Sequence, residues 1–324
     1  MEPERFDLKK LVRRSKLYVP ANREKFIEKA WTRGADCVIL DLEDAVAPAD
    51  KASARKMIRE EIPIVGKGGA EVQVRINREF EEEDLDAVVL PGLTSIMIPK
   101  CESAEELRRI DRKVTQLEKE RGLPVGKIQF DLIFETARGI VRMEEIAEAG
   151  PRIVSMTTGQ ADLSVDLGFT RYPELNFDQY FYAENKLLYA ARAAGVQGHG
   201  LGAQKNVDFV NISAGREAML KACRYAYNMG FMGTSAIHPG WVEVANEGFS
   251  PPREEVALAR RVKEALSQAY ERGEGSVSVD GRMYDVANMK RVNDLLARAE
   301  AVEKRDAEKA AAVAAGQGHS GRQV

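Results

Sequence analysis

Short apolar runs alternate with amphipathic segments along this chain, and polar residues follow many of the runs directly. We predict strands at 16–20, 36–42, 71–76, 94–99, 127–134, 152–157, 196–200 and 232–237. Helical periodicity fills 22–33, 48–61, 82–89, 103–121, 138–149, 177–194, 213–229 and 251–272. This alternation indicates repeated βα units and a parallel sheet. Eight units favour an α/β fold closed into a (β/α)8 (TIM) barrel. The alternative, an open doubly wound sheet, would usually carry a Gly-rich turn after its first strand, and residues 18–22 are not one.

The pattern changes after residue 272. A short β-like stretch and a charged helix follow, with too few apolar residues to form a core of their own. We therefore expect a barrel at 12–272 and a C-terminal helical appendage at 273–304 that packs on a neighbouring subunit. Residues 305–324 are Ala-rich and end in GQGHSGRQV, which predicts a disordered tail.

Composition and charge narrow the class of protein. The 324 residues are 44% hydrophobic, which is enough for a large globular core, and the formal net charge is −3. Binding to nucleic acid or to a membrane surface requires a clustered positive field, and the sequence gives no reason to expect one. A small-molecule partner is therefore expected. The three cysteines are widely spaced, which favours reduced thiols and a cytoplasmic location. The first twenty residues contain no apolar stretch of signal-peptide length.

Acidic residues follow the predicted strands at places that a barrel would bring together. The downstream end of every parallel strand in such a barrel opens onto the active site. Glu135 and Asp162 would lie at the mouths of adjacent strands, and Mg²⁺ typically takes one or two such carboxylates. The alternative is that Glu135 caps the following helix and Asp162 caps the turn at 162–168.

Arg75 ends an alternating strand, and its guanidinium there could bind a carboxylate through two parallel hydrogen bonds. The alternative is an ion pair with Glu43 or Asp44. Because these two acids are adjacent, only one could face the barrel mouth directly from an extended backbone. His238 ends the eighth strand without a visible nucleophile partner, which favours a structural or substrate-lining role.

Several motifs together form a specific signature over about residues 12 to 300. They are RSKLYVPANR at 14–23, LDLEDAVAP at 40–48, RIN at 75–77, IPK at 98–100, ETARG at 135–139, AIHP at 236–239 and DGRMYD at 280–285. In these motifs the chain resembles the citrate lyase β-subunit-like and malyl-CoA lyase-like aldolases of the HpcH/HpaI superfamily.

This resemblance implies a (β/α)8 barrel in which Glu135 and Asp162 hold Mg²⁺, with Mn²⁺ as a possible substitute. It implies that Arg75 contacts the substrate carboxylate and that Asp285 acts as acid or base in a neighbouring subunit's site. Asp44 is the third catalytic candidate. The expected coenzyme A contacts are Tyr18, Arg23 and Lys29. Besides Arg75 and the metal ligands, the expected substrate contacts are Ala161, Ile237 and His238.

The implied function is a carbon–carbon lyase of the oxo-acid-lyase type (EC 4.1.3-like). Such an enzyme converts a malyl-CoA- or citramalyl-CoA-type 3-hydroxyacyl-CoA to an acyl-CoA and a 2-oxo acid, glyoxylate or pyruvate, or runs the reverse reaction. Two alternatives stay open at this stage: an aldolase that acts on free 2-oxo acids without CoA, and a malyl-CoA-type thioesterase. The resemblance also implies a homotrimer or homohexamer.

Overall fold

The computed structural model describes the chain except residues 1–5, 7, 9, 170–178, 203–211 and 321–324. The chain divides into two compact units. One contains Arg13–Phe249 together with the end of the chain from Lys309, and the other contains Ser250–Glu308 with a short N-terminal segment.

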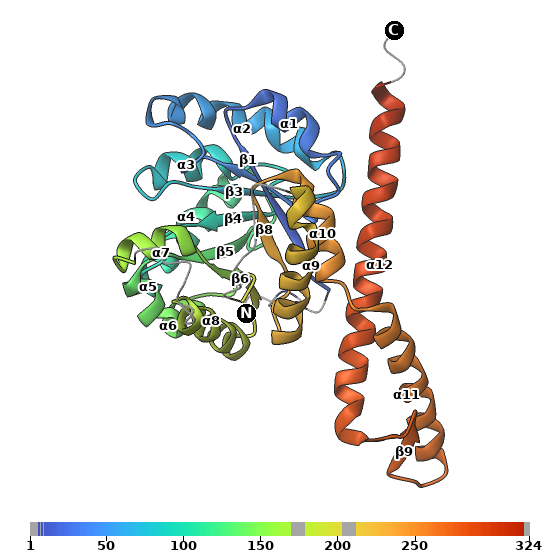
Figure 1. The fold of residues 1–324 in the computed structure, drawn as a ribbon. Helices are drawn as coiled ribbons and strands as arrows, with labels where there is room; N and C mark the ends of the chain where they lie inside the picture. Colours follow the sequence, from blue (N-terminus) through green and yellow to red (C-terminus); the bar gives the residue numbers. More distant parts are fainter. Residues whose placement is uncertain (1–5, 7, 9, 170–178, 203–211, 321–324) are drawn as a thin grey trace. The chain divides into compact units, whose positions relative to one another are not determined.

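Eight parallel strands form the sheet of the first unit (Figure 1). They are β1 (Ser15–Pro20), β2 (Cys37–Asp41), β3 (Glu71–Arg75), β4 (Ser95–Ile98), β5 (Gln129–Phe134), β6 (Ile153–Thr158), β7 (Gln197–His199) and β8 (Thr234–Ala236). Their order is β7-β6-β5-β4-β3-β2-β1-β8. The two edges approach each other through hydrogen bonds from Met232 N to Gly198 O and from Gly200 N to Gly233 O, both 2.9 Å long. The sheet is thus nearly closed, and the predicted barrel is confirmed.

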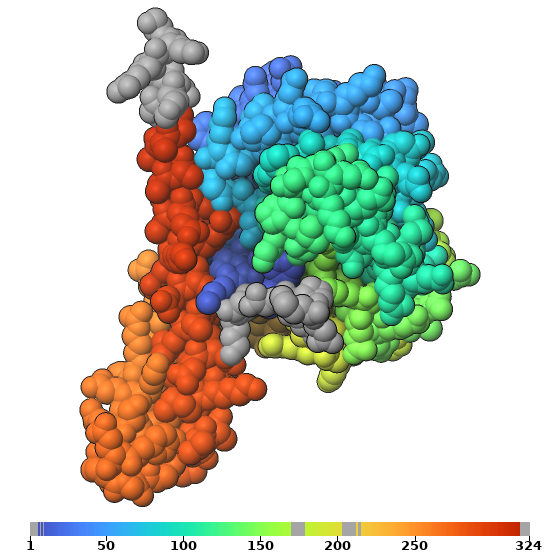
Figure 2. All heavy atoms as spheres, turned by 180° about the vertical axis from the view of Figure 1, so that it is seen from behind, coloured from blue at the N-terminus to red at the C-terminus, as the bar shows by residue number. Residues whose placement is uncertain are grey.

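Helices connect consecutive strands and cover the outside of the sheet. They are α1 (Glu24–Ala30), α2 (Lys51–Gly66), α3 (Glu81–Val88), α4 (Ala104–Glu120), α5 (Ala137–Val141), α6 (Met143–Ala147), α7 (Gln160–Asp166), α8 (Phe181–Ala194), α9 (Ile212–Met229) and α10 (Val242–Gly248). Ser103 caps the start of α4, because its side chain accepts hydrogen bonds from the N–H groups of Glu105 and Glu106. In the space-filling view the visible part of this unit runs in colour from blue through green to yellow (Figure 2).

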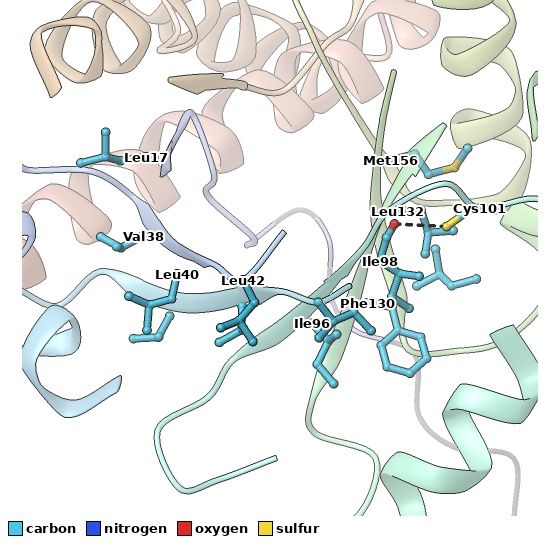
Figure 3. Packing of buried hydrophobic residues seen from close by; sticks show 14 of the residues in the cluster. Leu17, Val38, Leu40, Leu42, Ile96, Ile98, Cys101, Phe130, Leu132 and Met156 are labelled. Atoms are coloured by element: carbon cyan, nitrogen blue, oxygen red, sulfur yellow. Dashed lines mark hydrogen bonds between the residues drawn. The ribbon is translucent and has the colours of Figure 1, made fainter. Parts of the chain in front are cut away.

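The two faces of the strands serve different purposes. Outward-facing residues such as Leu40, Ile96 and Leu132 belong to the main hydrophobic core between the sheet and the helices (Figure 3). The inward-facing residues include a small apolar cluster of Ile39, Met97 and Ile133. Deeper in the barrel, Lys16 Nζ and Asp131 Oδ2 form a fully buried ion pair 2.9 Å long. Fixing the strands from both sides gives rigid ends on which a site can be built.

The second unit begins earlier than its sequence predicts. It contains α11 (Arg253–Glu271), the hairpin of β9 (Ser276–Val279) and β10 (Arg282–Asp285), and the part of α12 (Val286–Ser320) up to Glu308. Ala259, Val262 and Leu266 of α11 pack with Val292 of α12 in a separate core. Because α11 supplies most of this core, the compact unit starts at Ser250, whereas we expected the boundary after residue 272.

The structure also differs from the disordered tail expected at 305–324. Residues 305–320 continue α12, and residues 321–324 lie outside the described residues. The buried Lys309 explains part of this order, since its Nζ donates to Asp36 Oδ1 at 2.6 Å and to Gly34 O at 2.9 Å. Among the described helices, none combines the length and the apolar character that a membrane span requires.

Candidate active site

Charged side chains gather at the carboxyl ends of strands β2 to β6. Parallel strands place these ends on one face of the barrel, so residues far apart in sequence meet there. The group contains acids and bases together: Asp41, Glu43, Asp44, Arg75, Lys100, Glu135 and Asp162. The residues that the sequence predicts at the centre of the site, Arg75, Glu135 and Asp162, are therefore brought into one charged cluster.

Arg75 is held mainly by Asp41, a residue that our sequence reasoning did not assign to the site. Its Nε and Nη2 donate to the two carboxylate oxygens of Asp41 at 2.7 and 2.6 Å. Its Nη1 lies 2.9 Å from Glu43 Oε2 and 3.2 Å from Asp44 Oδ2. The alternative of an ion pair with the loop acids is thus realised. Because Asp41 is buried and Asp44 is exposed, the Asp44 contact is the weaker one.

The ring of Tyr18 packs against the guanidinium of Arg75. Its ring centroid lies 5.0 Å from the guanidinium carbon, within the range of a cation–π contact. Its hydroxyl group lies 3.1 Å from Met97 Sδ inside the barrel. Burial raises the pKa of Tyr18 well above its usual range, although Arg75 opposes that rise. Tyr18 is therefore a neutral platform under the guanidinium.

Lys100 connects three of the acids. Its Nζ lies 3.0 Å from Glu43 Oε1 and 3.2 Å from Asp162 Oδ2, and its backbone N–H donates to Glu135 Oε1 at 3.0 Å. Burial alone would lower the pKa of Lys100, but its hydrogen bond to Glu43 and the surrounding acids raise that pKa overall. The side chain therefore remains an ammonium group throughout the neutral pH range.

Glu135 is the most perturbed acid of the cluster. Burial and the charges of Glu43 and Asp162 raise its pKa to about 7, against the partial opposition of Lys100. A side chain at Gly159 would collide with it, because a Cβ atom there would overlap Glu135 Oε2. The glycine at the end of β6 therefore leaves space for this carboxylate. Thr136, not Glu135, caps α5, through a hydrogen bond from Gly139 N, so the capping alternative for Glu135 is wrong.

The cluster carries an excess of negative charge. Five carboxylates, those of Asp41, Glu43, Asp44, Glu135 and Asp162, face the two cations Arg75 and Lys100. An excess of this kind suits a divalent cation, which would lower the electrostatic cost of ionising Glu135. No group of three or more His, Cys, Asp or Glu side chains in the described part of the chain is arranged as a metal cage. A cation bound by Glu135 and Asp162 would take its other ligands from water and substrate, as Mg²⁺ usually does.

The other predicted site residues are spread more widely. Ala161 is exposed in α7, next to Asp162. Ile237 and His238 are exposed after β8, where His238 Nδ1 accepts from Gly240 N at 3.0 Å and caps a short 3-10 helix (Pro239–Trp241). Arg23 and Lys29 are exposed at the two ends of α1. Asp285 belongs to the second unit, where its Oδ1 accepts from Ala287 N and Asn288 N at the start of α12.

Our sequence reasoning also missed a buried acid near the end of β6. Glu184 of α8 accepts hydrogen bonds at Oε1 from Thr158 Oγ1 and, at 2.9 Å, from Gln160 Nε2. Its only signal is one acid in an Ala-rich helical segment, which is easily taken for a solvent-exposed residue. Asp41 was missed for the opposite reason, since it lies within an apolar strand. Lys100 stands in the IPK motif, which by itself indicates no role for its side chain.

Comparison with known proteins identifies the family to which this barrel belongs. A family model described as HpcH/HpaI aldolase/citrate lyase matches residues 14–239, which span all eight strands. The chain belongs to this family. The match covers every residue of the charged cluster, so the site described above is part of the family's common barrel and not of the appended unit.

Two relatives of known activity are similar in sequence to most of this chain. It is 34% identical over 277 residues to the citrate lyase subunit beta of Leuconostoc mesenteroides subsp. cremoris, covering 85% of this chain and 89% of that one. It is 35% identical over 305 residues to an L-malyl-CoA/beta-methylmalyl-CoA lyase of Cereibacter sphaeroides, covering 89% and 95%. Both relatives are lyases, and the predicted enzyme class is confirmed.

A solved structure extends the likeness to three dimensions. Protein CitE from Mycobacterium tuberculosis, in complex with magnesium, acetoacetate and coenzyme A, superposes with a TM-score of 0.65 at 30% identity. The alignment covers 90% of this chain and 99% of that chain.

The raised pKa of Glu135 predicts a pH-dependent loss of stability. Folding raises this pKa from 4.5 to about 7, so the folded state holds the proton more tightly than the unfolded chain. The free energy of unfolding of the metal-free protein should therefore decrease as pH rises between these values. Glu135→Gln removes the effect and should stabilise the metal-free protein at pH 8 by up to about 3 kcal/mol, with no difference near pH 4.

Chemical denaturation at both pH values measures this difference. Glu145→Gln, a change at an exposed acid of α6, is the matched control and should leave stability unchanged at either pH. A Glu135→Gln protein that is less stable than wild type at pH 8 would contradict the assignment of electrostatic strain to this carboxylate.

Proposed function

We propose that this protein is a Mg²⁺-dependent, CoA-linked carbon–carbon lyase. Its substrate would be a malyl-CoA- or citramalyl-CoA-type 3-hydroxyacyl-CoA, and its products an acyl-CoA and a 2-oxo acid, glyoxylate or pyruvate. The observation that carries this proposal is the combination of Glu135 and Asp162 with Arg75 at one barrel mouth. Glu135 and Asp162 form a site for a cation, and Arg75 forms a site for an anion. A substrate that offers oxygen ligands to a metal and also carries a carboxylate requires both sites.

Glu135 and Asp162 are the proposed metal ligands. Their carboxylates both contact Lys100, and the unusual pKa of Glu135 reflects negative charge that a divalent ion would neutralise. When bound, Mg²⁺ would supply a Lewis acid beside the oxygens of the 2-oxo acid. The neighbouring Ala161 would leave room for substrate beside Asp162.

Arg75 is the proposed partner of the substrate carboxylate. Asp41 keeps Nε and Nη2 occupied in a buried bidentate pair, so the guanidinium plane is fixed before substrate arrives. Asp44 is exposed and holds Nη1 at 3.2 Å. A substrate carboxylate would displace Asp44 from Nη1, and the displaced acid would remain at the edge of the reaction site. Ile237 and His238 would line the substrate from the end of β8.

Coenzyme A is proposed to lie near α1. Arg23 and Lys29 are exposed cations there, suited to the phosphates of the cofactor. Tyr18, the third expected contact, lies within the barrel against Arg75 and would act through the orientation of that residue.

Asp285 is the proposed proton-transfer residue, supplied by a neighbouring subunit of a homotrimer or homohexamer. In cleavage, the bond between the hydroxyl-bearing carbon and the α-carbon of the thioester breaks. The hydroxyl carbon becomes the carbonyl of the 2-oxo acid, and its hydroxyl proton would pass to the exposed carboxylate of Asp44 and from there to water. The bonding electrons pass to the acyl-CoA as an enolate, and protonated Asp285 donates a proton to its α-carbon. Condensation reverses these steps, with ionised Asp285 as the base.

Assay of the purified protein with Mg²⁺ tests the reaction class. We expect acyl-CoA and a 2-oxo acid to form in equal amounts from one member of a panel of malyl-CoA-type thioesters. The reverse reaction should consume an acyl-CoA with glyoxylate or pyruvate. Release of free CoA without a 2-oxo acid would instead indicate a thioesterase, and turnover of free oxo acids alone would indicate a CoA-independent aldolase.

The metal ligands predict the effect of two substitutions. Glu135→Gln and Asp162→Asn should each abolish Mg²⁺-dependent turnover while circular dichroism shows an intact fold, because each removes an anionic ligand. Glu144→Gln, at an exposed acid of α6, is the control and should keep wild-type activity. Near-normal activity of either ligand variant at low Mg²⁺ would contradict the metal assignment.

Subunit mixing tests the role of Asp285. Asp285→Asn and Glu135→Gln homo-oligomers should both be inactive, but hetero-oligomers reassembled from the two should regain part of the activity. Recovery is expected because some interfaces pair an intact barrel with an intact appendage. Absence of recovery, with subunit exchange demonstrated by mass spectrometry, would show that Asp285 does not act on a neighbouring subunit.

A further inference from the structure

Lys100 is attached to the cluster through both its backbone and its side chain. The backbone N–H holds Glu135, and the ammonium group bridges Glu43, which follows β2, and Asp162, which lies in the first turn of α7 after β6. One residue therefore touches both carboxylates of the proposed metal site. The side chain is 34% exposed, so the ammonium group is only partly separated from solvent.

The backbone of Lys100 is fixed in an unusual conformation. Its φ is +50°, in the left-handed region that non-glycine residues rarely adopt. Its carbonyl oxygen accepts from Arg78 Nη1, and Arg78 Nη2 is paired with Glu106 at 2.9 Å. On the other side, Cys101 N donates to Ile133 O at 3.1 Å. These contacts hold the residue where its N–H points at Glu135, and a strained conformation of this kind is typical of functional sites.

The side chain has more freedom than this anchor. Four methylene groups separate the ammonium from the backbone, and an ammonium is a compact, strongly hydrated charge with rotatable donors. It can move away from Asp162 while keeping Glu43, which is the closer of its two partners at 3.0 Å. The anchor therefore fixes Glu135, and the side chain supplies a charge that can be withdrawn from Asp162.

We propose that Lys100 is a built-in counter-ion of this site, which holds its carboxylates together in the metal-free protein and competes with the divalent cation for Asp162. The inference rests on the proposed function, because it takes Glu135 and Asp162 as the metal ligands. Like charges repel, so a divalent ion on Asp162 is opposed by an ammonium that approaches the same carboxylate. Metal binding would shift Lys100 toward Glu43 alone.

Two consequences separate this role from that of an ordinary structural lysine. Removing the ammonium makes the cluster more negative, so a divalent ion should bind more tightly. The same removal leaves the acids without their internal cation, so the metal-free protein should become less stable. A lysine that only supported the loop would give weaker metal binding and lower stability together.

Mn²⁺ titration followed by electron paramagnetic resonance of the free ion tests the proposal. In Lys100→Met, which keeps an unbranched side chain one atom shorter and removes its charge, we expect the Kd for Mn²⁺ to fall by about tenfold or more. Thermal unfolding of the metal-free variant should begin at a lower temperature than in wild type. Lys113→Met is the matched control, since Lys113 pairs with Asp86 on α3 and should leave the Kd unchanged.

Equal or weaker Mn²⁺ binding by folded Lys100→Met protein would overturn the counter-ion role. Lys100→Gln gives the same test if the methionine variant does not fold. Asp162→Asn separates this failure from failure of the proposed function: it should lose Mn²⁺ binding. If Asp162→Asn binds Mn²⁺ as wild type does, or if wild type binds none, the metal assignment itself is wrong and the inference falls with it.

Discussion

Repulsion among five carboxylates at the barrel mouth is the constraint on which this site depends. Two like charges 4 Å apart repel by about 4 kcal/mol at the effective dielectric constant near a protein surface. Acids at the ends of β2, β5 and β6 would therefore move apart unless cations or protons held them. Arg75 and Lys100 compensate part of this negative charge. The raised pKa of Glu135 reflects the repulsion that these two cations leave uncompensated. The site is assembled at an electrostatic cost that a divalent ion would remove.

The barrel can bear this cost because its strands are fixed from both faces. Outward-facing side chains pack against the helices, and inside the barrel a small apolar cluster lies above the buried Lys16–Asp131 pair. The anionic residues thus project from rigid ends. Asp41 shows why a rigid position matters. As a buried bidentate partner it fixes the guanidinium of Arg75, while the exposed contact between Arg75 and Asp44 stays free to exchange for a substrate carboxylate. Positioning of this kind reduces the entropy that substrate binding would otherwise lose in ordering side chains.

The strands were predictable because apolar runs with polar residues downstream are a local signal. All eight predicted strands are present, and Arg75, Glu135 and Asp162 meet as the barrel geometry requires. The role of Asp41 was not predictable, because an acid within an apolar run gives no sign of the arginine that faces it from the next strand. The helical structure of residues 305–320 could not be predicted for the same reason, since it depends partly on the contact between Lys309 and Asp36. The packing of α11 against α12 likewise forms only on folding. Such pairings are tertiary contacts that no local pattern records.

The location of a bound divalent ion tests the central claim most directly. Crystals of the protein grown with Mn²⁺ should show one anomalous scattering peak at the barrel mouth, within about 2.0–2.3 Å of an oxygen of both Glu135 and Asp162. Lys100 Nζ should then lie farther from Asp162 than the 3.2 Å seen here. A peak elsewhere, or an ion held by neither carboxylate, would contradict the account of this cluster as a metal site compensated by an internal cation.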